Sequence, residues 1–328
     1  MGQLIDGTWD PDPNMPAGDD GSFRRKPSTF RNWVTADGGP GPSGEGGFAA
    51  ESGRYHLYVS LACPWAHRTL IFRALKGLEA HVTVDVVHPD MLENGWTFSR
   101  DFPGATGDSV NAAGYLYQVY QKADPAATTR ATVPVLWDRH TGQIVSNESA
   151  EIIRMFNSAF DHITGNHQDF YPAALRPEID SVNERIYETV NNGVYRAGFA
   201  RSQAAYDRAV DALFESLDWL EERLTDRRYL VGTTVTEADW RLLTTLLRFD
   251  AVYHGHFKCQ RNRLTDFPAL WSYARELYQW PGVAGTVDFD HIRRHYHYSQ
   301  QSVNPHRIVP IAPRINWDAP HGRERLAA

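Results

Sequence analysis

The stretch 63–68, Cys-Pro-Trp-Ala-His-Arg, contains the residue with the clearest potential for chemistry. The aromatic and β-branched run 55–59 before it predicts a strand, and the run 69–76 after it predicts a helix. Pro64 suits a first helical turn, because the N–H group that proline lacks would have no partner there. Cys63 is therefore expected at a strand-to-helix junction.

A cysteine at such a junction favours nucleophilic chemistry. The first N–H groups of a helix carry partial positive charge, so they stabilise a thiolate and lower the pKa of the thiol. Ala66 stands where a dithiol motif has its second cysteine. A disulfide formed on Cys63 must then be resolved by an external thiol, for which glutathione is the abundant candidate. The alternative is a buried cysteine that serves as a small apolar residue.

Composition limits the classes of function. The chain has 328 residues, enough for about two domains, and its 42% hydrophobic content supports real cores. A net charge of -7 without a long basic run argues against nucleic acid and anionic membranes as partners. The 2 cysteines, Cys63 and Cys259, indicate a reducing compartment rather than a disulfide framework. With no signal-peptide pattern and no bilayer-spanning stretch, we expect a cytoplasmic protein.

The order of predicted elements indicates several domains. Four segments are expected: an irregular extension (1–53), a compact α/β domain (54–160), an all-helical domain (161–298) and a polar, Pro-rich surface tail (299–328). In the α/β domain a second strand at 81–87 completes a βαβ unit with parallel strands. After a long insertion, strands at 133–137 and 143–146 predict a hairpin, which a helix at 147–156 follows.

The helical half is expected to begin after a linker at 161–175. From Pro177 to about Tyr298, apolar residues recur at helical spacing. Residues 236–239, Thr-Glu-Ala-Asp, precede an apolar run and predict a capping box at a helix start.

This order of elements resembles the glutathione transferases, in which a thioredoxin-like domain precedes an all-helical one. In that family a cis Val-Pro step faces the catalytic thiol, and Val133-Pro134 stands at the matching place. A Glu-Ser pair at the next helix start holds the γ-glutamyl end of glutathione, and Glu148-Ser149 matches it. The helix N-terminus offers N–H groups to a carboxylate, and Glu148 can take the ammonium group.

Longer motifs resemble one class of that family, the glutathionyl-hydroquinone reductases or Xi class. They are Cys-Pro-Trp-Ala-His-Arg at 63–68, Glu-Asn-Gly-Trp-Thr-Phe at 93–98, Ser-Asn-Glu-Ser at 146–149, Asn-Asn-Gly-Val-Tyr at 191–195 and Arg-Phe-Asp at 248–250. The resemblance implies glutathione-dependent reduction of S-glutathionyl-hydroquinones to hydroquinones, with oxidised glutathione as the second product. It also implies glutathione as co-substrate, no metal, and a homodimer.

The resemblance further implies roles for individual residues. Cys63 is the implied nucleophile, which forms a mixed disulfide with glutathione, and Tyr195 is the implied proton donor to the departing ring. Tyr253 and Tyr296 match residues that lower the pKa of the thiol or hold the hydroquinone hydroxyls. The implied glutathione contacts are Trp96, Arg130, Ala131, Thr132, Val133, Glu148 and Ser149.

Two other functions remain open at this stage. One is a general monothiol transferase, similar to the omega class, that acts on mixed disulfides or dehydroascorbate. The other is a non-catalytic scaffold that reuses the fold. The three tyrosines favour the reductase, because disulfide exchange requires no proton on carbon, although a tyrosine on a helix is by itself more often a packing residue.

Other residues that could do chemistry have plainer explanations. His291, His295 and His297 lie close together in sequence but lack a cysteine or carboxylate at a standard zinc spacing. His67, one turn beyond Cys63, is compatible with a role as base for the thiol or with packing against the sheet. Cys259 is interpreted as structural or incidental, with a resolving role as a minor alternative.

Overall fold

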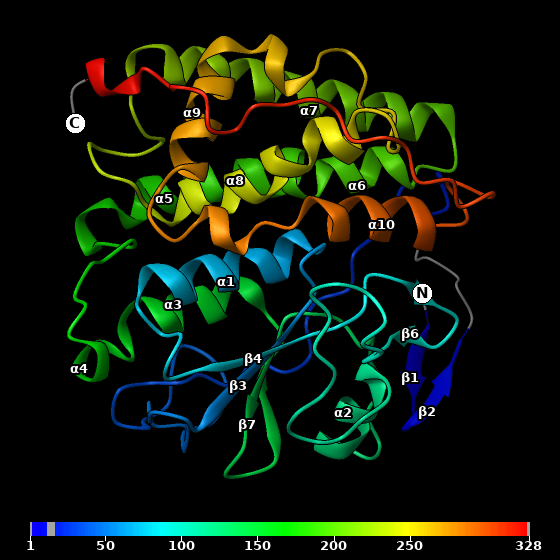
Figure 1. Ribbon diagram of the computed structural model, residues 1–328, viewed down its shortest axis with the longest axis vertical. Coiled ribbons are helices and arrows are strands. Elements are labelled where there is room, and N and C mark those ends of the chain that lie inside the picture. The colour runs from blue at the N-terminus through cyan, green and yellow to red at the C-terminus, as the bar shows by residue number, and fades with distance from the viewer. Residues whose placement is uncertain (1, 12–16, 327–328) are drawn as a thin grey trace. The chain divides into compact units, whose positions relative to one another are not determined.

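The computed structural model describes residues 2–11 and 17–326, and its residues group into two compact units (Figure 1). Unit 1 comprises Met1–Met15, Lys26–Gln168 and Thr286–His295; unit 2 comprises Pro16–Arg25, Asp169–Gly285 and Tyr296–Ala328. This division differs from the four segments expected from the sequence. The extension and the tail are incorporated into the units, because both make specific hydrogen bonds to them.

Unit 1 is built on a four-stranded mixed sheet. Its main elements are β3 (Tyr55–Val59), α1 (Pro64–Leu75), β4 (Thr83–Val86), β7 (Val135–Asp138), β8 (Gln143–Ser146) and α3 (Ser149–Ser158). The strand order is β4-β3-β7-β8, with β3 and β4 parallel and the other pairs antiparallel. The predicted βαβ unit and hairpin are therefore confirmed, and with them a thioredoxin-like fold.

The central strand β3 is buried along its whole length. Leu57 pairs with Val84 on one side and with Leu136 on the other. Helices α1 and α3 pack against each other and cover the sheet (Figure 1). The run 55–59 was recognisable in the sequence because its aromatic and β-branched residues favour a strand.

The N-terminal extension, predicted to be irregular, contains regular elements. Strands β1 (Gln3–Ile5) and β2 (Thr8–Asp10) form an antiparallel hairpin. Leu4 exchanges two backbone hydrogen bonds with Thr129, at 2.7 and 3.0 Å, so the hairpin is tied to the loop before Arg130. This pairing lies between residues far apart in sequence, and local composition therefore predicts only an irregular segment.

The long insertion and the predicted linker contain short elements of their own. The insertion forms β5 (Met91–Leu92), β6 (Gly95–Trp96) and α2 (Leu116–Ala123), and the linker forms α4 (Asp161–Thr164) and η1 (Ala173–Leu175). The linker prediction missed α4, which is a single helical turn that Gly165 terminates with φ +69°.

Unit 2 is all-helical. It contains α5 (Arg176–Ile186), η2 (Tyr187–Asn191), α6 (Gly193–Gly198), α7 (Gln203–Asp226), α8 (Glu237–Arg248), η3 (Phe249–Tyr253), η4 (Leu264–Asp266), α9 (Pro268–Tyr278) and η6 (Arg323–Arg325). The 12 residues of α8 are all buried, which makes it the centre of this unit. The capping box predicted at 236–239 is confirmed at its N-terminus.

Two features of the helices were not expected. η2 and η3 are π-helical turns that continue α5 and α8, and such turns often occur at functional sites. After η5 (Ala284–Thr286), helix α10 (Phe289–Ser299) is shared, since its residues up to His295 belong to unit 1 and those from Tyr296 to unit 2.

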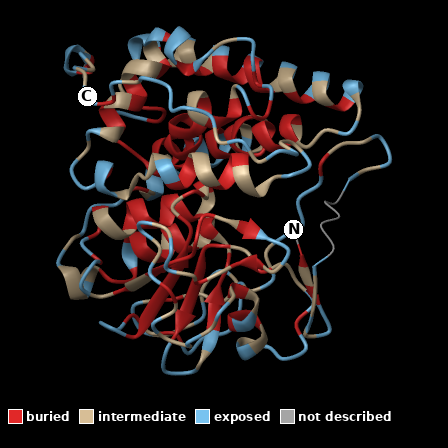
Figure 2. Cartoon of the chain, turned by 45° about the vertical axis from the view of Figure 1, so that its right-hand side comes forward, coloured by how far each residue is buried: buried red, intermediate tan, exposed pale blue. Residues whose placement is uncertain are grey.

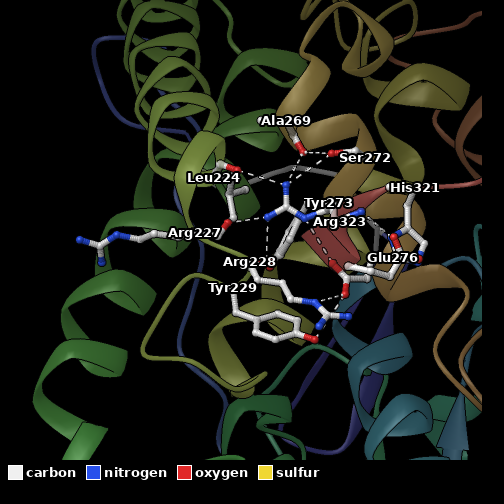
Figure 3. A network of polar contacts seen from close by, with 12 residues as sticks. Leu224, Arg227, Arg228, Tyr229, Ala269, Ser272, Tyr273, Glu276, His321 and Arg323 are labelled. Carbon is white, nitrogen blue, oxygen red and sulfur yellow. Dashed lines mark hydrogen bonds and ion pairs between the residues drawn. The ribbon is translucent and has the colours of Figure 1, made fainter. Parts of the chain in front are cut away.

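The C-terminal tail is anchored at Arg323, whose side chain is buried. Figure 3 shows its guanidinium group donating hydrogen bonds to the carbonyl oxygens of Leu224, Arg227 and Arg228, at 2.6 to 3.1 Å. It also pairs with Glu276 at 3.2 Å. These carbonyls lie at the C-terminal end of α7, where backbone acceptors lack partners within the helix and attract positive charge. The segment that the sequence predicted as a surface tail is therefore held to the helical unit at Arg323.

Burial follows the fold in each unit. Figure 2 shows buried residues in the sheet of unit 1 and on the inward sides of the helices of unit 2. Within residues 2–11 and 17–326, no helix is both long and apolar enough to cross a bilayer.

Candidate active site

Cys63 is the N-cap residue of α1, with Pro64 in the first turn, as the sequence predicted. The backbone of Cys63 is extended, with φ -79° and ψ 121°, and its carbonyl accepts the N–H of His67 at 2.9 Å. The side chain is half-buried, and its Sγ lies 3.7 Å from the carbonyl oxygen of Val133. Cys63 therefore stands at the helix terminus whose unpaired N–H groups favour a negative charge.

The loop facing this sulfur has a fixed shape. The peptide bond between Val133 and Pro134 is cis, as the resemblance implied. The buried Tyr120 donates its hydroxyl proton to the Thr132 carbonyl at 2.8 Å and accepts the N–H of Thr132 and the side-chain amide of Asn147, both at 3.2 Å. Burial raises the pKa of Tyr120, so its hydroxyl stays protonated and can keep donating.

Glu148 caps the N-terminus of α3, and its side chain accepts the N–H of Ala150 at 3.0 Å. Ser28 of the extension donates to the other carboxylate oxygen at 2.9 Å, and Arg68 lies 3.8 Å away. Burial alone would raise the pKa of Glu148, but the Arg68 charge and these two hydrogen bonds outweigh it and lower the pKa. The carboxylate is therefore charged at neutral pH, as an ammonium ligand requires.

Ser149, the next residue, is held by Arg68. The guanidinium group donates two hydrogen bonds to Ser149 Oγ, from Nε at 2.9 Å and from Nη2 at 2.6 Å. Arg68 stood in the quoted motif but was not assigned a role, because nothing in the sequence links it to Ser149, 81 residues later.

The other implied glutathione contacts also belong to unit 1. Trp96 of β6 is buried and stacks on His295 of α10, with ring centroids 4.6 Å apart. His295 is oriented by a 2.9 Å hydrogen bond from Nδ1 to the Pro89 carbonyl. Arg130 is half-buried and Ala131 is buried, and both precede the cis peptide bond.

Unit 2 brings the three candidate tyrosines together, although they come from α6, η3 and α10. The Tyr296 hydroxyl lies 2.5 Å from that of Tyr195 and 3.0 Å from that of Tyr253. The three phenols thus form one hydrogen-bonded row with Tyr296 in the middle. We call these three residues the tyrosine cluster.

Exposure differs along the tyrosine cluster. Tyr195 is 8% exposed, whereas Tyr296 is 1% and Tyr253 is 0% exposed. Burial raises the pKa of Tyr253 well above its usual value, so this end of the row is a protonated phenol. Phe257 packs against all three rings and keeps the surroundings apolar.

The extension supplies a contact to the tyrosine cluster that sequence reasoning missed. The guanidinium carbon of Arg25 lies 5.1 Å from the ring centre of Tyr195. The Nε of Arg25 donates to the side-chain oxygen of Asn192 at 3.0 Å, which holds the guanidinium group in place. A cation over an aromatic face is an attractive contact, but composition around Arg25 carries no signal for it.

The remaining candidates have other partners. The Nε2 atom of the buried His67 lies 2.8 Å from the Thr286 hydroxyl, and the Nε2 atom of His291 lies 2.6 Å from the Pro103 carbonyl. Among the residues that the structure describes, no three potential metal ligands cluster. Cys259 is fully buried, and burial raises the pKa of its thiol, which makes it unreactive.

Two family models match this chain. Residues 62–159 match the glutathione S-transferase N-terminal domain, and residues 203–276 match the C-terminal domain of the same family. The first match contains Cys63, the cis peptide bond and Glu148-Ser149.

Three relatives are similar over nearly the whole length. The chain is 59% identical to a glutathionyl-hydroquinone reductase of Escherichia coli K12, YqjG, over 99% of both chains, and 52% identical to that of Sphingobium chlorophenolicum, PcpF, over 95% of this chain and 96% of the relative. The glutathione-bound structure of YqjG superposes with a TM-score of 0.92, at 57% identity over 98% of this chain and 99% of that one. A Xi-class transferase of Natrialba magadii has a TM-score of 0.91, at 47% identity over 100% and 98% of the two chains. The chain belongs to the glutathione transferase family, as a member of its Xi class.

Proposed function

We propose that this protein is a glutathionyl-hydroquinone reductase, which reduces S-glutathionyl-hydroquinones to hydroquinones and forms oxidised glutathione. The thiolate of Cys63 attacks the sulfur of the glutathionyl group. A bond forms between the two sulfurs, the bond between sulfur and the aromatic carbon breaks, and the ring leaves with the electron pair and takes up a proton. A second glutathione thiolate then attacks the mixed disulfide, which releases oxidised glutathione and restores Cys63.

The observation that carries this proposal is a single thiol at the helix N-terminus, in a chain 59% identical to a named glutathionyl-hydroquinone reductase. Ala66 occupies the position where a dithiol enzyme has its resolving cysteine. Cys259 is buried and unreactive, so the resolving thiol comes from solution. The first half of the cycle transfers the glutathionyl group of the substrate to Cys63. The second half consumes one molecule of free glutathione.

We assign the proton donor for the departing ring to Tyr195. Its hydroxyl belongs to the least buried ring of the tyrosine cluster, and it shares a short hydrogen bond with Tyr296. As Tyr195 loses its proton to carbon, the Tyr296 hydroxyl can donate to the phenolate that forms. Tyr253, which is fully buried, acts as a positioning residue through Tyr296.

Glutathione is assigned to the loop and helix start beside Cys63. The ionised Glu148 would bind the γ-glutamyl ammonium group, and Ser149 with the N-terminus of α3 would bind the carboxylate. The backbone of Val133, held in place by Tyr120 through Thr132, would pair with the cysteinyl peptide of the ligand. Trp96, Arg130 and Ala131 would complete the contacts.

A comparison of two substrates tests the function. Purified protein is incubated with glutathione and either a glutathionyl-hydroquinone or the mixed disulfide of glutathione and 2-mercaptoethanol. Free hydroquinone and oxidised glutathione, measured by liquid chromatography in a one-to-one ratio, are expected from the first substrate. Turnover of the mixed disulfide alone would instead establish the omega-like transferase. Turnover of neither substrate would favour a non-catalytic scaffold.

Two further properties are proposed on chemical grounds and on the resemblance. A reaction that consumes reduced glutathione requires a reducing compartment, for which the cytoplasm is the natural choice. A homodimer is expected as in related transferases. Light scattering coupled to size-exclusion chromatography would give a mass near 74 kDa for a dimer, about twice the 37.2 kDa of the chain.

A further inference from the structure

The Arg68 side chain is a buried cation that points at a hydroxyl group. Arg68 is 2% exposed, and Ser149, whose Oγ accepts from both its Nε and its Nη2, is 4% exposed. The guanidinium carbon also lies 5.1 Å from the ring centre of Trp65, one turn earlier in α1. Burying a cation is costly without compensating interactions, and the two hydrogen bonds to Ser149 and the Glu148 carboxylate 3.8 Å away help to supply them.

The hydrogen bonds of Ser149 determine what its hydroxyl can do. A serine hydroxyl has two lone pairs that accept and one proton that it donates. The two N–H groups of Arg68 use both lone pairs. The proton of Ser149 has no acceptor within residues 2–11 and 17–326, although the residue is almost fully buried. This proton, which no described protein group accepts, is available to an acceptor on a ligand.

We propose that Arg68 is a positioning residue that makes Ser149 an obligate hydrogen-bond donor to the α-carboxylate of the γ-glutamyl group. This inference rests on the proposed function only in that glutathione is the ligand. With its lone pairs occupied, the hydroxyl cannot turn to accept from a ligand, so it selects an anion over an ammonium group.

The neighbouring Glu148 provides the matching site for the ammonium group of the ligand. Its carboxylate lies 3.8 Å from Arg68 and carries a charge opposite to that of the guanidinium group. The buried guanidinium group therefore favours binding of the ligand's carboxylate at Ser149. Glu148 stays ionised, because its pKa is lowered, and can bind the ligand's ammonium group. A free α-amino acid end carries both charges, which matches the γ-glutamyl end of glutathione.

The position of Arg68 also couples this end of the ligand to the nucleophile. Cys63 is the N-cap of α1 and Arg68 lies in its second turn, so one rigid helix carries both. The hydroxyl that binds the carboxylate is thereby set at a fixed distance from the sulfur. Such preorganisation reduces the entropy lost when substrate and nucleophile are aligned.

Two truncated ligands test the inference. Glutaryl-Cys-Gly keeps the carboxylate of the γ-glutamyl group and lacks the amine, whereas 4-aminobutanoyl-Cys-Gly keeps the amine and lacks the carboxylate. Their dissociation constants, and that of glutathione, are measured by calorimetry on the full-length protein and on Arg68→Met, Arg68→Lys and Ser149→Ala. Thermal unfolding by circular dichroism is recorded for each variant.

The expected result is a loss that is larger for carboxylate ligands. Arg68→Met and Ser149→Ala should each weaken glutathione and glutaryl-Cys-Gly by roughly 10- to 100-fold. Ser149→Ala should change 4-aminobutanoyl-Cys-Gly by less than about 2-fold, whereas Arg68→Met can also change the binding of this amine, because Arg68 lowers the pKa of Glu148. Arg68→Lys, which keeps a charge and one donor, should recover part of the loss. The double variant Arg68→Met with Ser149→Ala should be little worse than either alone, because both remove one interaction.

Several outcomes overturn the inference. An equal loss for both truncated ligands would mean that Arg68 supports the fold and not the carboxylate. If Arg68→Met fails to fold, the inference is tested with Ser149→Ala and Ser149→Thr. Only the threonine variant keeps a hydroxyl donor, so only it should retain the preference for glutaryl-Cys-Gly over 4-aminobutanoyl-Cys-Gly. Because these are binding measurements, a protein with this preference but no hydroquinone product would refute the proposed function and leave the inference standing.

Discussion

The region around Cys63 and the tyrosine cluster are built in opposite ways. The first uses polar groups at the ends of elements: the N-cap of α1, a cis peptide bond and the N-cap of α3. The second uses three phenols from distant elements, buried among aromatic rings. The first region offers backbone dipoles that favour a negative charge, whereas in the second burial raises the pKa of Tyr253 and keeps that phenol protonated.

Because of this difference, substitutions in the two regions should abolish different reactions. Changes near Cys63 should affect every glutathione-dependent reaction, because each needs the thiolate and the bound tripeptide. Changes in the tyrosine cluster should affect only reactions that place a proton on carbon.

Cys63→Ala should have the largest effect. Removing the nucleophile should reduce turnover of both the glutathionyl-hydroquinone and the mixed disulfide by ~10³-fold or more, while glutathione still binds. Cys259→Ala is the matched control, expected to retain turnover. Mass spectrometry should find glutathione attached to the wild-type protein at Cys63 and nowhere in Cys63→Ala; turnover retained by that variant would remove the assigned nucleophile.

Tyr195→Phe separates the two regions. Loss of a general acid should slow hydroquinone release by roughly 10²- to 10⁴-fold, and turnover of the mixed disulfide should change by less than about 3-fold. Rapid-quench measurement of the first turnover checks that the loss lies in ring release. Equal losses on both substrates would show that the tyrosine supports the fold or the thiol instead.

Arg323→Met tests whether losses in the helical unit come from unfolding. Removing the guanidinium group leaves the carbonyls at the end of α7 without donors and breaks a pair with Glu276, which should cost about 3 kcal/mol of unfolding free energy. Arg325→Met, an exposed position two residues later, should change it by less than about 0.5 kcal/mol. Urea denaturation measures both; below the transition, activity of Arg323→Met should stay normal.

Tyr296→Phe breaks the row of phenols at its middle while keeping the ring. The Tyr195 hydroxyl loses its short hydrogen bond, which should reduce hydroquinone release by about 10-fold. Tyr253→Phe, one position further from Tyr195, should cost less. Tyr298→Phe on the same helix serves as control. A larger loss in Tyr253→Phe than in Tyr296→Phe would contradict the assigned order of the row.

Arg25→Met should have the smallest effect, a decrease of about 2- to 5-fold in hydroquinone release, because a cation over an aromatic ring is worth about 0.5 to 1 kcal/mol. The neighbouring Arg24→Met should be neutral. The measurement is a ratio of hydroquinone to mixed-disulfide turnover for each variant, since only the first reaction should respond to Arg25.

Prediction from sequence succeeded where a few adjacent residues determine the conformation. The strand before Cys63, the helix after it and the capping box at 236–239 each follow from local patterns. Prediction failed where distant residues meet. The pairing of Leu4 with Thr129 and the anchoring of Arg323 carry no local signal, because each depends on a partner tens of residues away or more.

The chain of residues alone determined that one cysteine would begin a helix without a second thiol nearby, since proline, helix periodicity and the absence of a cysteine at 66 are local facts. Only the folded structure decided that Arg68 occupies both lone pairs of Ser149 and that Tyr296 joins Tyr195 to Tyr253. The physical reason is that hydrogen bonds reach about 3 Å, and whether two distant side chains come that close depends on how whole helices pack.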